Sequence, residues 1–179
     1  MRLINRCKGV TLFTKPFPMK TSSLLLSVCV ALILTACNFS AGTNKDLRTG
    51  LSYSYNGFAV EKVLLVDSEN SIKTDNEVVM NSKVAIAIEG LTNYTLKDDK
   101  AFPGMQLLVT DKQGTAVVEE ADLFADSPGY SAEDAAFLRG TVTVGDPMKA
   151  GETYHVKVRV WDKNKPDNEL TAEIDLVVL

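Results

Sequence analysis

Residues 154–178 read YHVKVRVWDKNKPDNELTAEIDLVV, and this stretch decides the fold class. Its first eight residues alternate apolar and polar side chains, and a second alternating run occupies its last nine residues. Alternation with a period of two is typical of a strand that buries one face, and the polar, proline-containing segment between the runs predicts a loop. The stretch therefore predicts a β-hairpin with Val158 and Ile174 buried on its inner face.

Further strands are expected upstream of this hairpin, because short apolar or alternating runs recur between turn residues. These runs are residues 58–67, 83–89, 106–110, 115–119 and 141–144. One short helix is expected between Ser131 and Gly140, where Ser131-Ala132-Glu133-Asp134 has the form of a capping start. Seven or eight short strands in roughly 120 residues predict an all-β sandwich over residues 57–179.

The end of the chain also resembles a known class of module. Gly151-Glu152-Thr153-Tyr154, followed by an alternating strand that ends at Asp162, is similar to the last two strands of immunoglobulin-like and PKD-type extracellular domains. The resemblance covers residues 150–179 and implies an immunoglobulin-like sandwich, in which Tyr154 forms a corner hydrogen bond. The Cys…Trp…Cys spacing of antibody-type domains is absent.

The first 36 residues have the organisation of an export signal. Five of the 19 Lys and Arg residues lie before residue 21, whereas all 23 Asp and Glu residues lie after residue 44. The apolar run LLLSVCVALIL at residues 24–34 is shorter than the roughly 20 residues that a membrane-spanning helix needs. It has the length of a signal-peptide apolar region.

This run ends in Leu34-Thr35-Ala36-Cys37, which resembles the lipobox of bacterial lipoproteins. The resemblance implies a signal peptide at residues 1–36, cleavage after Ala36, a diacylglyceryl thioether on Cys37 and acylation, as by palmitate, of the new amino terminus. The alternative is an ordinary signal peptide with a chance cysteine. Asn38 replaces the Asp that marks inner-membrane retention in such lipoproteins, which favours the outer membrane. Met19 opens a complete signal peptide, so we expect translation to start there.

The mature chain that this predicts is acidic. Residues 1–36 hold five of the 19 basic residues, so 14 remain against 23 acidic ones, a formal charge of −9. An acidic chain repels nucleic acid and anionic lipid, so no nucleic-acid partner is expected and membrane attachment is assigned to the lipid. Residues 37–56, rich in Ser, Gly, Asn and Thr, predict a flexible tether; the alternative is that Tyr53 and Tyr55 begin a first strand.

No combination of residues indicates catalysis. His155 is the only histidine, and the alternation places it on the polar face of its strand. Cys37 is unavailable as a nucleophile if it is acylated, and the chain has no Cys and His cluster of the kind zinc requires. The neighbouring acids Asp98-Asp99, Glu119-Glu120 and Glu133-Asp134 are read as solvated surface, because adjacent residues on a strand point to opposite faces.

Two sets of residues are candidates for binding. The first is a set of aromatic side chains that could stack on sugars: Trp161, Tyr130 and Phe124.

The second set consists of oxygen-bearing side chains around the loop of the C-terminal hairpin. Calcium takes six to eight oxygen ligands in flexible loops, which makes a weak calcium site the hypothesis. A plain turn held by Asp and Asn side chains is the alternative. The residues are Asp162, Asn164, Asp167 and Glu169, with Asp111 as a further ligand if its loop shares the same end of the sandwich.

The sequence thus predicts a non-catalytic cell-envelope lipoprotein whose sandwich binds a protein partner or a surface structure. A carbohydrate-binding accessory module is the alternative, and a small hydrolase is the third hypothesis. An exposed patch that gathers the three aromatic residues would favour sugar binding. An unpaired edge strand or an exposed apolar patch would favour a protein partner. A deep pocket with two acids would favour an enzyme.

Overall fold

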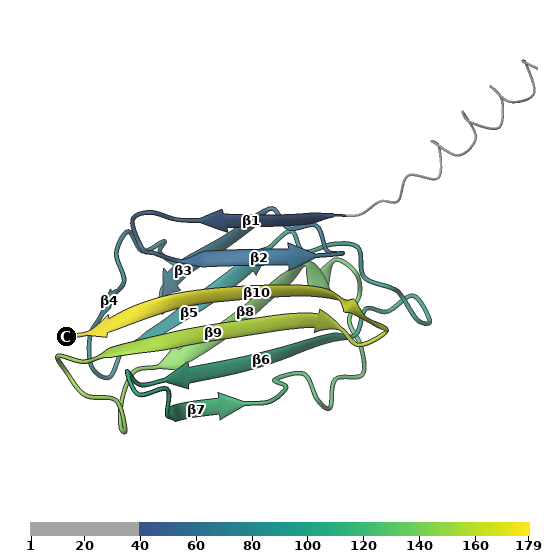
Figure 1. Cartoon of the computed structure of the whole chain (residues 1–179). Coiled ribbons are helices and arrows are strands. Elements are labelled where there is room, and N and C mark those ends of the chain that lie inside the picture. Colours follow the sequence, from purple (N-terminus) through teal and green to yellow (C-terminus); the bar gives the residue numbers. More distant parts are fainter. Residues whose placement is uncertain (1–39) are drawn as a thin grey trace, which may run out of the picture. The chain divides into compact units, whose positions relative to one another are not determined.

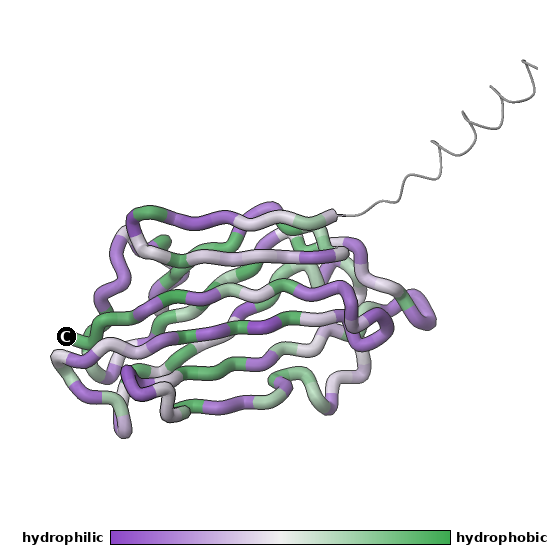
Figure 2. The backbone as a smooth tube through the Cα atoms, in the orientation of Figure 1, coloured by the Kyte–Doolittle hydropathy of each residue, from purple (hydrophilic) through white to green (hydrophobic). Residues whose placement is uncertain are grey.

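The predicted C-terminal hairpin forms the centre of the larger of two sheets (Figure 1). In the computed structural model, which describes residues 40–179, β9 (Thr153–Asp162) pairs antiparallel with β10 (Lys165–Val178). Val158 and Ile174 are buried on the inner face, as predicted, and the fold is confirmed as an all-β sandwich. Figure 2 shows the alternation of hydropathy along both strands.

The larger sheet has seven strands. Its order is β1 (Ala41–Lys45), β2 (Ser52–Asn56), β10, β9, β6 (Pro103–Thr110) and β7 (Ala116–Glu120), and the short β4 (Glu77–Val78) pairs in parallel with the end of β10. The other pairings are antiparallel. The predicted turn between the strands at 106–110 and 115–119 is present, and Gly114 adopts a positive φ of 81° there.

The smaller sheet packs behind the larger one and has the order β3 (Lys62–Asp67), β5 (Lys83–Glu89) and β8 (Phe137–Thr143). The inner faces of both sheets share one apolar core. At Gly140 the sheets come so close that an added Cβ would lie 2.9 Å from Cγ2 of Val158. The largest fully buried side chains of this core include Phe58, Leu51, Ile86, Ile88, Leu91, Met105 and Leu170.

The prediction of a flexible tether through residue 56 is wrong for residues 41–56, which form β1, β2 and the turn between them. Tyr53 and Tyr55 lie opposite Ala172 and Leu170 of β10 and pack against the core, so the alternative of a first strand is correct. The residues that alternate with these tyrosines are small and polar, so the strand pattern resembled a polar linker. Leu51, almost fully buried, completes the same inward-facing series.

The predicted helix is also wrong. Ser131 does cap the backbone N–H of Asp134 at 3.0 Å, but only a single 3-10 turn, η1 (Asp134–Ala136), follows. The chain then enters β8, in which Leu138 faces the core and Phe137 faces outward. The predicted helix would have had about two turns, which is too short to be stable alone. Every second residue from 138 to 142 is buried instead, and this favours a strand.

Residues 40–179 contain no helix that is long and apolar enough to cross a membrane. The predicted signal peptide (1–36), the start at Met19 and the acylated Cys37 lie outside the described residues.

Candidate functional site

Asp162, the first residue of the predicted calcium loop, is fully buried and serves as a clamp between loops. Its Oδ2 accepts the backbone N–H of Thr95 at 2.6 Å, and its Oδ1 accepts that of Asn164 at 2.9 Å. Asn164 in turn donates from Nδ2 to the carbonyl of Thr95 at 2.8 Å. Both carboxylate oxygens are therefore engaged by the protein's own backbone.

Tyr94, the neighbour of Thr95, packs against the apolar core. Its ring packs edge-on against Phe58, 4.9 Å between centroids, and its hydroxyl donates to the carbonyl of Ala135 at 3.2 Å. Burial, followed by the nearby charge of Asp162, raises the pKa of Tyr94 above its ordinary value. The hydroxyl therefore stays protonated and acts as a structural donor.

The structure does not bring the five predicted calcium ligands together. Asp162 lies opposite Pro103 at the start of β6, whereas Asp111 follows Thr110 at the far end of that strand. The Oδ1 atom of Asp111 instead accepts the N–H groups of its own turn. Glu169 pairs with Arg159 at 2.9 Å. Nowhere in residues 40–179 do three or more acidic, His or Cys side chains gather as a metal site would require.

The three predicted sugar-binding aromatics do not form one patch. Phe124 and Tyr130 contact each other, with centroids 5.7 Å apart, and Phe124 packs against the core. Trp161 alternates with buried residues and therefore lies on the outer face of the larger sheet. Its ring covers Gly104, where an added Cβ would come within 2.1 Å, and Arg159 lies 5.2 Å from its ring centroid.

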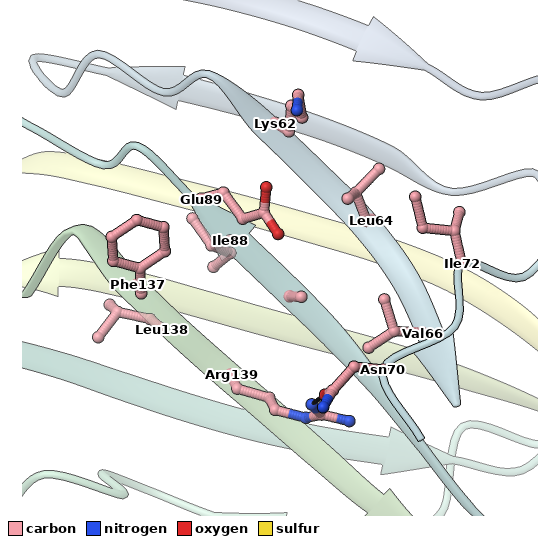
Figure 3. Close-up of a pocket in the computed structure, with 11 residues that line it drawn as sticks. Lys62, Leu64, Val66, Asn70, Ile72, Ile88, Glu89, Phe137, Leu138 and Arg139 are labelled. Carbon is pink, nitrogen blue, oxygen red and sulfur yellow. Dashed lines mark hydrogen bonds between the residues drawn. The ribbon is translucent and has the colours of Figure 1, made fainter. Parts of the chain in front are cut away.

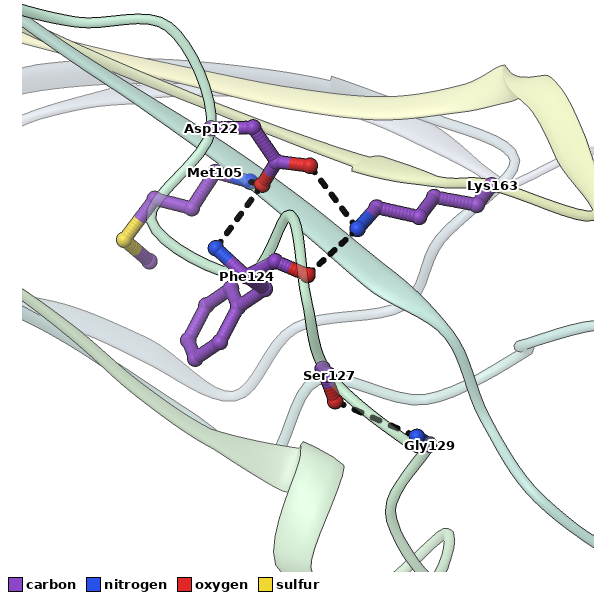
Figure 4. A network of polar contacts seen from close by, with 6 residues as sticks. All are labelled: Met105, Asp122, Phe124, Ser127, Gly129 and Lys163. Atoms are coloured by element: carbon purple, nitrogen blue, oxygen red, sulfur yellow. Dashed lines mark hydrogen bonds and ion pairs between the residues drawn. The ribbon is translucent and has the colours of Figure 1, made fainter.

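The loop that carries Phe124 is fixed by a polar network that the sequence did not reveal (Figure 4). The ammonium of Lys163 contacts Oδ2 of Asp122 at 2.8 Å and the carbonyl of Phe124 at 2.6 Å. Oδ1 of Asp122 accepts the N–H groups of Met105 and Phe124, at 3.0 and 2.9 Å. The contacts of Lys163 and Met105 join residues that are far apart in the sequence, so no local pattern reveals them.

Opposing influences act on the pKa of Asp122. Partial burial favours the neutral acid, but the hydrogen bonds from Lys163 and two backbone N–H groups favour the carboxylate, as does the charge of Lys163. The net effect holds the pKa of Asp122 below its ordinary value. The network is therefore a charged structural lock at neutral pH.

A groove of about 600 Å³ lies on the outer face of the smaller sheet (Figure 3). Two cross-strand rows of outward-facing side chains line it, namely Lys62, Glu89 and Phe137, then Leu64, Ala87 and Arg139. The small Ala87 on the central strand leaves a hollow between the larger side chains on either side. Ile72, brought back against Val66 by an antiparallel bridge, extends the wall on the β3 side.

The rim of this groove is apolar and exposed. Phe137 is 64% exposed and Ile72 is 58% exposed, on opposite sides of the hollow. Arg139 closes one end by donating to Asn70 and to the carbonyl of Asp67, the latter at 2.9 Å. With Lys62 and Arg139 against Glu89, the lining has a basic excess in an otherwise acidic domain.

A second, polar hollow lies between the β6–β7 turn and the segment before β9. Three acids line it: Asp111 caps its own turn, Glu152 pairs with Lys112 of the same lining at 2.8 Å, and Asp146 is the third. Tyr154 lines it and accepts the N–H of Lys149 at 2.9 Å, the corner hydrogen bond that the sequence led us to expect. His155 is outside the hollow and contacts Asp175.

Sequence reasoning missed the groove. The alternation of residues 137–143 was a usable signal, since placing Leu138 inward sends Phe137 to the outer face. Ile72 gave no comparable signal, because it stands in an irregular segment whose position depends on the bridge to Val66. No protein-family model matches this chain, and no curated protein is significantly similar to it.

Proposed function

We propose that this chain is a non-catalytic cell-envelope lipoprotein, anchored to the outer membrane through lipid on Cys37, whose sandwich binds a protein partner at the groove on β3, β5 and β8. The observation that carries the proposal is the exposure of Phe137 and Ile72 around a hollow floored by Ala87. Large apolar side chains around a concavity gain free energy when a partner removes them from water.

The distribution of aromatic residues favours a protein partner over a sugar. A sugar-binding module needs an exposed aromatic platform, but Trp161 covers Gly104 and Phe124 packs against the core. The outer strands of the smaller sheet, β3 and β8, each have β5 as their only strand partner within the described residues. The edge of β3 is partly covered, because Ile72 bridges to Val66 and Lys73 donates to the carbonyl of Leu65 at 2.9 Å. The strand edge of β8 beside an apolar hollow is a feature of a peptide- or protein-binding face.

The chemistry of the groove defines the segment that would fit it. Ala87, Leu64 and Phe137 offer an apolar seat for one bulky side chain. Lys62 and Arg139 outnumber Glu89 around that seat, which favours an acidic group beside the inserted side chain. The partner proposed here is therefore a protein segment with an apolar residue next to an acidic one.

The anchor part of the proposal rests on the lipobox Leu34-Thr35-Ala36-Cys37 at the end of the apolar run. Cys37→Ala should leave precursor or soluble protein and abolish labelling by a palmitate analogue, measured by membrane fractionation and fluorography. Unchanged labelling and unchanged fractionation would contradict a lipid on Cys37. Stable attachment needs more than one acyl chain, so partial acylation should give weaker membrane association.

The groove is tested by site-specific photocrosslinking in intact cells. A photoreactive residue at position 137 or 72 should give one discrete adduct, and the same residue at Leu47 or Val79 should give none, although both are exposed apolar positions outside the groove. Ala87→Arg fills the hollow and should abolish the adduct without displacing the protein from the membrane. Identical adducts at all four positions, or an adduct that Ala87→Arg leaves unchanged, would rule out the groove.

A further inference from the structure

We infer that the acyl anchor holds one end of the sandwich directly against the lipid surface, with the opposite end presented away from the membrane. This inference rests on the proposed acylation of Cys37, and it concerns where the domain lies once it is anchored. It follows from the position at which β1 begins.

The ordered ladder begins almost immediately after the proposed acylated residue. β1 pairs with β2 from Ala41 opposite Asn56, and the carbonyl of Ser40 already accepts the N–H of Gly57 at 2.7 Å. Three residue steps separate Cys37 from Ser40. A fully extended chain covers at most about 11 Å in three steps. The 20-residue tether expected from the sequence would instead have allowed about 25 Å on average.

Contacts identify the end of the sandwich that this short connection reaches. Asn56, opposite Ala41, donates from Nδ2 to the carbonyl of Asp167 at 3.0 Å. Asn168 donates to the carbonyl of Asn93 at 2.8 Å, which brings the loop around Leu96 to the same end. In Figure 1 the described chain enters at this end, where β9 finishes and β6 starts.

The opposite end is far enough away to be distinguished. β9 has ten residues, and at about 3.3 Å per residue it separates the two ends by roughly 33 Å. Leu47, in the turn after β1, lies at the far end and is 89% exposed, whereas Leu96 at the near end is 46% exposed. These two leucines provide matched reporter positions on exposed loops.

Charge gives the near end no affinity of its own for anionic lipid. The acidic side chains of its loops outnumber the basic ones: Glu61, Asp98, Asp99, Asp122, Asp126, Glu133, Asp134 and Asp167 against Lys97, Lys100, Lys163 and Lys165. Repulsion from an anionic surface acts within a Debye length of about 8–10 Å, the scale of the connection itself. The acyl chains, and not the domain, therefore provide the holding force, and zwitterionic lipid gives the cleanest test.

This placement also orients the groove. β8 begins with Phe137 at the near end and runs away from it, while Arg139 and Asn70 close the groove farther along. The row of Lys62, Glu89 and Phe137 is therefore the part of the groove nearest the lipid surface. A partner must approach this face from the side, parallel to the membrane.

The experiment uses the acylated protein in phosphatidylcholine vesicles that contain lipids with a spin-labelled headgroup. Cys37 is the only cysteine of the mature chain, so Leu96→Cys and Leu47→Cys each supply a single free thiol for a fluorophore. We expect quenching at position 96 to be several-fold stronger than at position 47. Inserting 20 Gly and Ser residues between Asn38 and Phe39 should abolish the difference while the protein still floats with the vesicles.

Equal quenching at the two positions of the uninterrupted protein would overturn the inference, as would a difference that survives the insertion. Flotation with the vesicles and the mass of the acylated amino-terminal peptide are measured on the same samples. Failure of flotation or absence of the acyl mass would contradict the proposed lipoprotein itself, so the two failures are distinguishable.

Discussion

The two outer faces of the sandwich differ in whether their side chains have polar partners on the neighbouring strands. On the larger sheet, β9 and β10 are joined by two cross-strand ion pairs, Lys157–Glu173 at 2.7 Å and Arg159–Glu169 at 2.9 Å, and by a hydrogen bond between His155 and Asp175 at 2.8 Å. On the smaller sheet, the corresponding central positions hold Leu64, Ala87 and Phe137 around a hollow. The polar side chains of the first face pair with one another, whereas the second face exposes apolar side chains to water.

This contrast shows that a β-sandwich need not use both outer faces in the same way. Charged pairs opposite one another make a face soluble and resist pairing with other chains. An apolar hollow with exposed rims lacks these charges. Such a hollow either binds a partner that covers it or is too small to affect the solubility of the protein. The following variants separate the contribution of each face to stability from its contribution to binding.

The largest effect should come from the core beneath the ion-pair face. Ile174→Ala removes a buried side chain and should lower the free energy of unfolding by about 2–5 kcal/mol. Lys157→Ala, one strand away on the outer face, should cost less than about 0.5 kcal/mol. Urea melts of the chain from residue 38 onward measure both. Comparable losses would mean that the strand register is inverted.

The next effect concerns the lock between Asp122 and Lys163, which is more buried than the ion pairs of the outer face. Their side chains are 19% and 28% exposed, against 37–68% for the three cross-strand pairs. Asp122→Ala leaves the N–H groups of Met105 and Phe124 without their acceptor and leaves the ammonium of Lys163 with only the carbonyl of Phe124, which should cost about 1–3 kcal/mol at neutral pH. Asp126→Ala, at an exposed neighbour, is the matched control and should change stability little.

The same lock makes a signed prediction for pH. Because folding lowers the pKa of Asp122, its contribution is complete above the unfolded pKa of about 3.9. The contribution is lost as the pH falls through the lower pKa of the folded state. The stability difference between the wild type and Asp122→Ala should therefore shrink in urea melts at about pH 3 relative to neutral pH. A difference that grows in acid would contradict the assignment of the carboxylate as the bonded form.

Local pattern predicted the parts of the fold in which burial itself is periodic. The hairpin of β9 and β10, strand β5 and the β6–β7 turn follow from alternation and turn chemistry, because each side chain's environment repeats along one segment. β2 was not predicted as a strand, because its outward-facing residues are small serines and Tyr53 and Tyr55 were taken as part of a polar linker. β8 was predicted only in its second half, as the strand at 141–144, because the start signal at Ser131 was taken to begin a helix and instead capped a single 3-10 turn.

The candidate site was less predictable, since it depends on contacts between distant segments. The sequence placed oxygen-bearing residues in one loop, but it did not show that Thr95 would take the carboxylate of Asp162. It placed Trp161 on the polar face, but it did not show that Gly104 would lie under the ring. The groove forms only when β3, β5 and β8 pair in register and the loop that carries Ile72 folds back onto Val66. The sequence of a single strand predicts neither arrangement.

A smaller effect is expected from a single pair of the ion-pair face. Lys157 and Glu173 are directly opposite and about 40% exposed, so a double-mutant cycle should give a coupling of about 0.2–1 kcal/mol. This coupling should fall at high salt, because exposed charges are screened. A coupling of several kcal/mol that salt does not change would show that the face is rigid and desolvated, and would weaken the contrast between the two faces.

The smallest effect on stability should accompany the largest effect on binding, and it tests the contrast at its sharpest point. Phe137 is mostly exposed, so Phe137→Thr, which keeps a strand-forming residue, should change the free energy of unfolding by no more than about 0.5 kcal/mol. The same variant should lose the adduct formed from a photoreactive residue at Ile72, because the apolar rim on the β8 side is gone. Leu138→Ala is the control for the opposite case, since that neighbour is buried and its truncation should cost about 2–5 kcal/mol. If Phe137→Thr destabilised the domain as much as Leu138→Ala, the ring would be a structural element of the sandwich. The uncovered face would then give no reason to expect a partner.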